Sequence, residues 1–92
     1  MINYSAEWAP VLELEMKRWS SKGCAQLIAE LDELQAYEVE FDAKQYQVEV
    51  ELLENTAEYI HVIVAVDDGT LPASIKPMCD GFIRKKGRAS VL

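Results

Sequence analysis

Four glutamates and the single histidine are the residues of this chain whose types and spacing could support chemistry. They stand at alternating positions in neighbouring segments: Glu38, Glu40, Glu49, Glu51 and His61. Alternate side chains of a strand point to the same face of a sheet, so the five share one face if these segments pair as strands. Carboxylates grouped with an imidazole are typical of cation sites and of acid–base pairs.

The segment 45–66 decides whether these side chains meet. Its first half alternates apolar and polar residues and its second half is rich in β-branched residues, with a polar break between them. These patterns predict a β-hairpin. In the register that we predict, Leu52 lies opposite Ile60. Glu51 is then the cross-strand neighbour of His61, with Cβ atoms about 5 Å apart.

A further strand is predicted at about 36–42, before the hairpin. With Phe41 opposite Tyr46, Glu38 faces Glu49 on the outer side of the sheet, and the apolar side chains face inward. Like charges directly opposite each other destabilise a sheet unless cations offset them. The candidate binding residues on the outer side are Glu38, Glu49, Glu51 and His61.

Two helices are predicted before the sheet, at about 8–20 and 24–34. The first has apolar residues at three- and four-residue spacing between Trp8 and Trp19, and Glu15 falls at the same spacing. Pro10 is tolerated only in a first helical turn, which places the start of this helix near residues 7–9. We expect both helices to cover the inner face of the sheet.

The chain is predicted to be a single α+β domain of 92 residues, because domains of this size bury one core. Its fold class is two N-terminal helices packed on one face of a three- to four-stranded antiparallel meander. Val50, Val62 and Val64 should face the helices. A basic C-terminal tail at 84–92 should add little to the core. The strands are predicted at about 36–42, 45–53, 58–67 and 71–76.

The overall charge and the positions of the cysteines exclude some classes of function. A net charge of −7 argues against nucleic-acid binding, which needs clustered cations. Cys24 and Cys79 are far apart and form no zinc motif, and no cofactor or metal is expected. The N-terminal residues do not resemble a signal peptide and no apolar run is long enough for a membrane span, so we expect a cytoplasmic protein.

The outer sheet face admits three interpretations, and we favour a non-catalytic one. No catalytic motif is present, the cysteines are placed away from His61, and an open sheet offers no cleft to desolvate a carboxylate. We therefore expect a binding module that engages a protein partner or a second copy of itself through this face. The alternatives are a small enzyme or cation-binding protein that uses Glu49, Glu51 and His61, and an acidic inhibitor of a basic protein.

Overall fold

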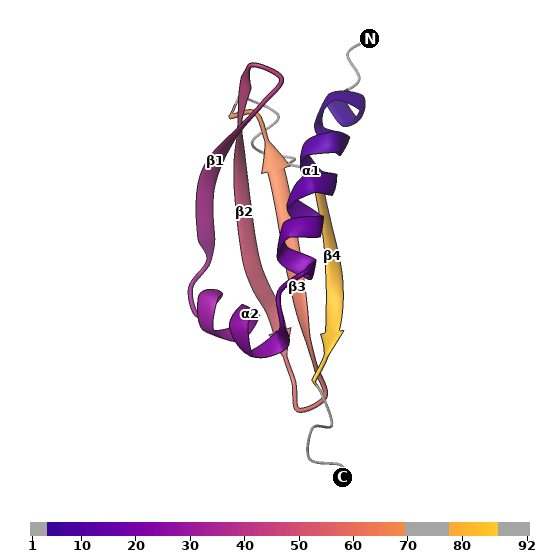
Figure 1. The fold of residues 1–92 in the computed structure, drawn as a ribbon, viewed down its shortest axis with the longest axis vertical. Coiled ribbons are helices and arrows are strands. Elements are labelled where there is room, and N and C mark those ends of the chain that lie inside the picture. Colours follow the sequence, from indigo (N-terminus) through magenta and orange to yellow (C-terminus); the bar gives the residue numbers. More distant parts are fainter. Residues whose placement is uncertain (1–3, 70–77, 87–92) are drawn as a thin grey trace.

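A computed structural model describes residues 4–69 and 78–86 of the chain. Helices α1 (Tyr4–Ser20) and α2 (Cys24–Glu30) precede strands β1 (Gln35–Phe41), β2 (Lys44–Asn55), β3 (Tyr59–Asp67) and β4 (Met78–Lys85). The strands form one antiparallel sheet in the order β1-β2-β3-β4, and both helices lie on the same side of it (Figure 1). The predicted α+β meander with two N-terminal helices is confirmed. Neither described helix is long and apolar enough to cross a membrane.

The core lies between the helices and the inner face of β2 and β3. Along β3, every second side chain is buried, as strand geometry requires when one face is covered. Val50, Val62 and Val64 are fully buried, which confirms the predicted inner face. The strands also bury Tyr46, Val48, Ile60 and Val66. The helices and the residue after α2 contribute the other buried apolar side chains: Trp8, Val11, Leu12, Trp19, Leu27 and Leu31.

The helix ends differ from those predicted. Helix α1 begins at Tyr4, so Pro10 lies inside it and not in its first turn. The buried side chains of Trp8 and Val11 flank the exposed Pro10. Their packing therefore holds the helix on both sides of the lost hydrogen bond. Helix α2 ends at Glu30 and not near residue 34, because the acidic residues that follow disfavour a longer helix.

The last part of the chain also differs from the prediction. The strand expected at 71–76 lies outside the described residues. Strand β4 lies in a part of the chain where no strand was predicted, and it includes Arg84 and Lys85 from the start of the predicted basic tail. The guanidinium of Arg84 donates a hydrogen bond to the carbonyl of Ser20 at the end of α1. The beginning of the predicted tail is therefore part of the sheet and contacts the first helix.

The turn between β1 and β2 changes their register. Asp42 and Ala43 form a two-residue connection in which both have positive φ, 55° and 65°. Phe41 consequently lies opposite Lys44 and not opposite Tyr46. The shift is two residues, and a shift of two keeps every side chain on its predicted face.

Candidate functional site

The outer face of the sheet carries the residues singled out in the sequence. Both helices lie on the opposite side (Figure 1), so no helix of the described chain covers this face. Its β3 and β4 half is mainly small or apolar and includes Ile63, Ala65, Cys79 and Ile83. Its β1 and β2 half is acidic and carries Glu38, Glu40, Glu49, Glu51 and Glu54. The face is thus divided into an acidic half and an apolar half.

The predicted binding residues share this face but are not paired as expected. Glu38 lies opposite Gln47 and not opposite Glu49, because of the two-residue turn. Glu49 itself lies between Ala36 and Ala65. The predicted repulsion between two directly opposed glutamates is therefore avoided.

A bulge in β2 separates Glu51 from His61. Leu52 lies opposite Val62, and the register then shifts between Leu52 and Glu54. The predicted pairing of Glu51 with His61 is wrong: Glu51 lies opposite Ile63. A bulge sets two residues against one on the partner strand, and such an irregularity leaves no reliable signal in a sequence of alternating side chains.

His61 instead has Glu54 as its neighbour, which sequence reasoning did not find. The Nδ1 atom of His61 is 3.9 Å from Oε1 of Glu54. The hydroxyl of Tyr59 donates a hydrogen bond of 3.2 Å to the same oxygen, and this bond raises the pKa of Tyr59. In residues 4–69 and 78–86, no three His, Cys, Asp or Glu side chains converge as metal ligands would. The geometry here is that of two neighbouring side chains at the surface.

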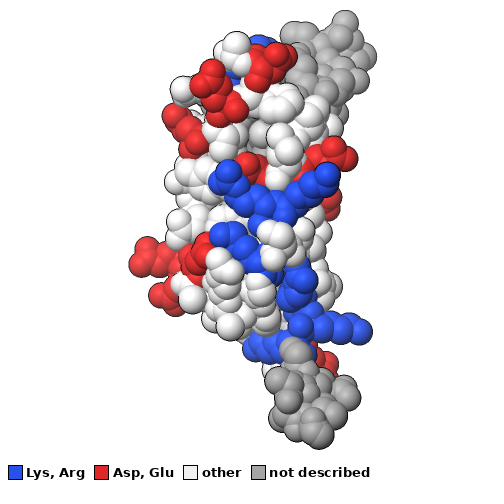
Figure 2. Space-filling view, in the orientation of Figure 1, with Lys and Arg blue, Asp and Glu red and all other residues white. Residues whose placement is uncertain are grey.

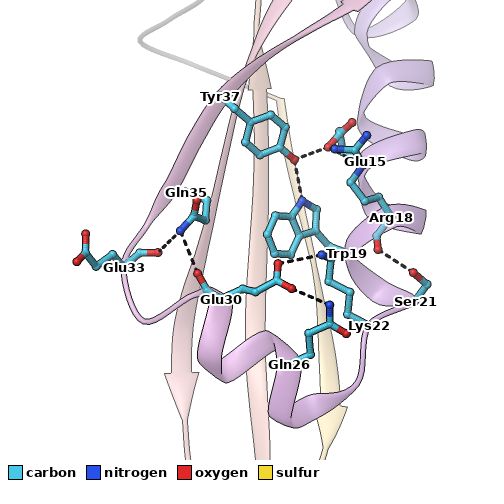
Figure 3. A network of polar contacts seen from close by, with 10 residues as sticks. All are labelled: Glu15, Arg18, Trp19, Ser21, Lys22, Gln26, Glu30, Glu33, Gln35 and Tyr37. Carbon is cyan, nitrogen blue, oxygen red and sulfur yellow. Dashed lines mark hydrogen bonds and ion pairs between the residues drawn. The ribbon is translucent and has the colours of Figure 1, made fainter.

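A second polar cluster lies between α1 and β1, on the helix side (Figure 3). The Tyr37 hydroxyl donates to the carboxylate of Glu15, and Nε1 of Trp19 donates to the Tyr37 oxygen over 2.7 Å. Nε of Arg18 is 4.0 Å from the same Glu15 oxygen. Glu15 is only 5% exposed, so a carboxylate is held in the core by a hydroxyl and a guanidinium.

This buried cluster is suited to a structural role. Burial, followed by the hydrogen bond to Glu15, raises the pKa of Tyr37 to about 12. Tyr37 therefore keeps its proton at neutral pH and is a poor acid or base. A groove of about 490 Å³ between α1 and β1 is lined by both apolar and charged side chains, and Glu15 is one of them. The sequence signal for Glu15 was its position four residues after Val11 and four before Trp19, but nothing local indicated its partner.

Basic residues gather on the helix-bearing side of the molecule. Figure 2 shows Lys and Arg side chains running along this side toward the end of the sheet. The contact of Arg84 with Ser20 joins two basic segments that are distant in the sequence. Together the end of α1, the turn after it and the end of β4 supply six of the nine cations: Lys17, Arg18, Lys22, Arg84, Lys85 and Lys86. Of these, Lys85 lies on the outer face of β4, on the same side as Ile83.

Comparison with protein-family models, with curated proteins and with solved structures finds no significant match to this chain. Function is therefore inferred from the geometry alone. The Glu15–Tyr37 cluster is largely closed to solvent, whereas the outer sheet face presents both charge and apolar area to a partner.

Proposed function

We propose that the chain is a non-catalytic interaction module that binds a basic partner protein through the outer face of its sheet. The main support for the proposal is that an acidic half and an apolar half lie side by side on the outer face of the sheet, which neither described helix covers. In the apolar half, the side chain of Ile83 is 57% exposed. Exposed apolar side chains bordered by charges are typical of protein-binding surfaces.

Charge selects the kind of partner. Five glutamates extend from the outer side of β1 and β2, and they would attract a basic surface and speed its association. Two copies of this chain stacked face to face would bring glutamates together, which costs affinity. A basic protein therefore fits this face better than a second copy does, and an inhibitor of a basic protein is one form of such a module.

The alternative of a cation site or an acid–base pair has less support. It requires Glu49, Glu51 and His61 to converge. Glu49 and Glu51 lie opposite Ala65 and Ile63, and His61 lies across the bulge beside Glu54. The three side chains share a face without forming one cluster.

Charge reversal on the outer face tests the proposal. The double variant Glu49→Lys/Glu51→Lys reverses two outer-face charges, and Asp32→Lys/Glu33→Lys makes the same change in net charge at exposed positions after α2. A partner captured from cell lysate by the wild-type protein is then titrated with all three proteins by calorimetry. We expect a basic partner whose affinity falls at least tenfold, about 1.4 kcal/mol, for the outer-face variant alone. Equal affinity for all three proteins would overturn the proposal.

A further inference from the structure

Strand β4 is an edge of the sheet within the described residues, and one side of its backbone faces away from β3. The amide of Lys86 donates to the carbonyl of Glu58 over 2.8 Å, just beyond the pair Tyr59 and Lys85. Hydrogen-bonded pairs alternate along an antiparallel ladder. The residues of β4 whose N–H and C=O groups point to the free edge are therefore Cys79, Gly81, Ile83 and Lys85.

The surroundings of Gly81 agree with this assignment. Its N–H donates to the side chain of Asp80 over 2.8 Å. Because this N–H bonds to the Asp80 side chain, it does not bond to the backbone of β3. The edge therefore presents a repeated set of backbone donors and acceptors, which is the template that a further strand needs. When such a strand pairs, the N–H of Gly81 must exchange the Asp80 side chain for a carbonyl of that strand.

We propose that β4 pairs with β4 of a second copy, antiparallel and about a two-fold axis at Phe82, so that the two sheets become one of eight strands. This proposal is independent of the partner proposed for the outer face. In this register Asp80 lies opposite Arg84 of the second copy, so opposite charges pair across the axis twice. Phe82 lies opposite Phe82 of the second copy at a non-hydrogen-bonded position, where facing side chains are closest.

The same register covers an exposed apolar side chain. Ile83, which is 57% exposed, lies opposite Gly81 of the second copy. The side chain of Ile63 extends over Gly81, so Ile83 would pack against an apolar side chain there. Moving the axis to Gly81 would set Arg84 opposite Met78, and moving it to Ile83 would set Arg84 opposite Phe82. Only the axis at Phe82 pairs Asp80 with Arg84, and charge complementarity therefore fixes the register.

The opposite edge of the sheet is unsuited to self-pairing. Phe41 and Lys44 flank a two-residue turn and form a hydrogen-bonded pair, so Glu38 and Glu40 lie at positions whose backbone groups face the free edge. Two copies of β1 side by side would put four glutamates on adjacent strands, which is destabilising. Charge thus disfavours one edge and favours the other.

Helix α1 leaves room for this pairing. It packs on β3 and β4, and its flank above β4 lines a hollow of about 240 Å³ beside Asp80 with the small or flexible side chains of Ala9, Glu13 and Met16. The side chains of Asp80 and of Arg84 from the second copy can meet within this space.

Proline substitution at matched edge positions tests the proposal. Ile83→Pro removes an N–H that points away from β3 and leaves the β3 ladder intact, whereas Glu38→Pro makes the equivalent change on β1. Molar mass is measured by light scattering during size exclusion, and circular dichroism checks the fold. We expect the wild-type protein and Glu38→Pro to be dimers and Ile83→Pro to be a monomer. A monomeric wild-type protein at the highest concentration reached, or a dimeric Ile83→Pro, overturns the proposal.

Charge exchange tests the pairing in a way that does not depend on proline. Asp80 is exposed, so Asp80→Arg leaves the fold intact and is expected to weaken the dimer at least tenfold. Adding Arg84→Asp to it restores the opposite-charge pair and should restore the affinity. Arg84→Asp also removes the contact with Ser20, so circular dichroism must show that the double variant is folded, and Arg84→Asp alone should be as weak a dimer as Asp80→Arg. If Asp80→Arg binds itself as tightly as the wild-type protein does, the pairing about Phe82 is wrong.

A cross-link tests the register itself. In a Cys24→Ser background, Lys85→Cys places a thiol opposite Cys79 of the second copy, and mild oxidation should give a covalent dimer. Ile83→Cys would cross-link to Cys79 efficiently only if the axis were at Gly81. Preferential cross-linking of Ile83→Cys would therefore contradict the register, and preferential cross-linking of Lys85→Cys supports it.

Discussion

Removing one hydroxyl group, with the substitution Tyr37→Phe, tests the buried cluster between α1 and β1. The hydroxyl donates to Glu15 and accepts from Trp19, and both of these residues are 5% exposed. Leaving a buried donor or acceptor without a partner costs about 1–3 kcal/mol, and more when the group is charged. Arg18 remains near Glu15 and limits the loss. We expect the free energy of unfolding to fall by about 2–4 kcal/mol.

Urea denaturation followed by circular dichroism measures this loss, and a melting curve should show a decrease of roughly 10–25 °C for a domain of this size. Tyr59→Phe is the matched control, because its hydroxyl bonds to Glu54, a side chain that is 51% exposed. The control should change stability by less than about 0.5 kcal/mol. If the two variants unfold at the same urea concentration, the buried cluster does not stabilise the fold as the structure indicates.

A double variant separates the loss of the hydrogen bond from the cost of leaving the buried Glu15 carboxylate without its donor. In Tyr37→Phe the Glu15 carboxylate remains buried without its hydroxyl donor, whereas Glu15→Leu combined with Tyr37→Phe removes both members of that bond. The Trp19 N–H loses its acceptor in both variants, so this loss cancels in the comparison. Replacing both members of a buried polar pair costs far less than removing one. The double variant should therefore be more stable than Tyr37→Phe alone, and a double-mutant cycle gives the coupling energy directly.

Three further results are expected. Val62→Ala should lower the free energy of unfolding in urea by about 1–3 kcal/mol, since Val62 is 0% exposed. Gly81→Ala should cost about 1–3 kcal/mol by overpacking, because its Cβ would lie 2.8 Å from the backbone oxygen of Val62 and 2.7 Å from Cδ1 of Ile63. Calorimetric melting of Gly23→Ala should show little change, since nothing lies within 4 Å there. The pKa of Tyr37 is raised to about 12, so its contribution to stability should be full below pH 10 and lost as pH rises to 12, measured by absorbance titration beside denaturation.

The arrangement of layers was predictable because it depends on patterns that repeat. The alternation around Val48 and Val50, and the helical spacing from Trp8 to Trp19, set which faces are buried, and any even shift in register preserves them. The predicted fold class is therefore correct although the predicted register is not. The predicted pairs of outer-face residues are wrong, because each pair depends on single irregularities of the strands.

Two of these irregularities have no strong sequence signal. Ala43 adopts a φ of 65°, a conformation that glycine or asparagine usually marks. The bulge near Leu53 adds one residue to a strand of ordinary composition. Both irregularities change the cross-strand neighbours of the glutamates. The sequence therefore predicts the face on which the candidate residues lie but not which of them lie opposite each other.

Strand β4 was missed because neither of its faces is consistently apolar. Its inner side alternates Met78, Asp80, Phe82 and Arg84, and its outer side includes Gly81. An edge strand is only partly covered, so polar residues are tolerated at positions that a central strand would fill with valine. The partner of Glu15 was missed for a different reason: Tyr37 lies on another element, and only tertiary packing brings the two together.

The contact between the first helix and the last described strand has a consequence for synthesis. Helix α1 packs on β3 and β4, and Arg84 holds the carbonyl of Ser20. On the ribosome, α1 emerges long before the surface that it covers, and contacts between distant parts of a chain slow folding. A nascent chain that ends before β4 exposes the apolar stripe of α1 and an unpaired edge of β3. Chaperones and proteases act on exposed apolar surface and unpaired strand edges, so we expect them to engage such a chain until translation supplies the missing strand.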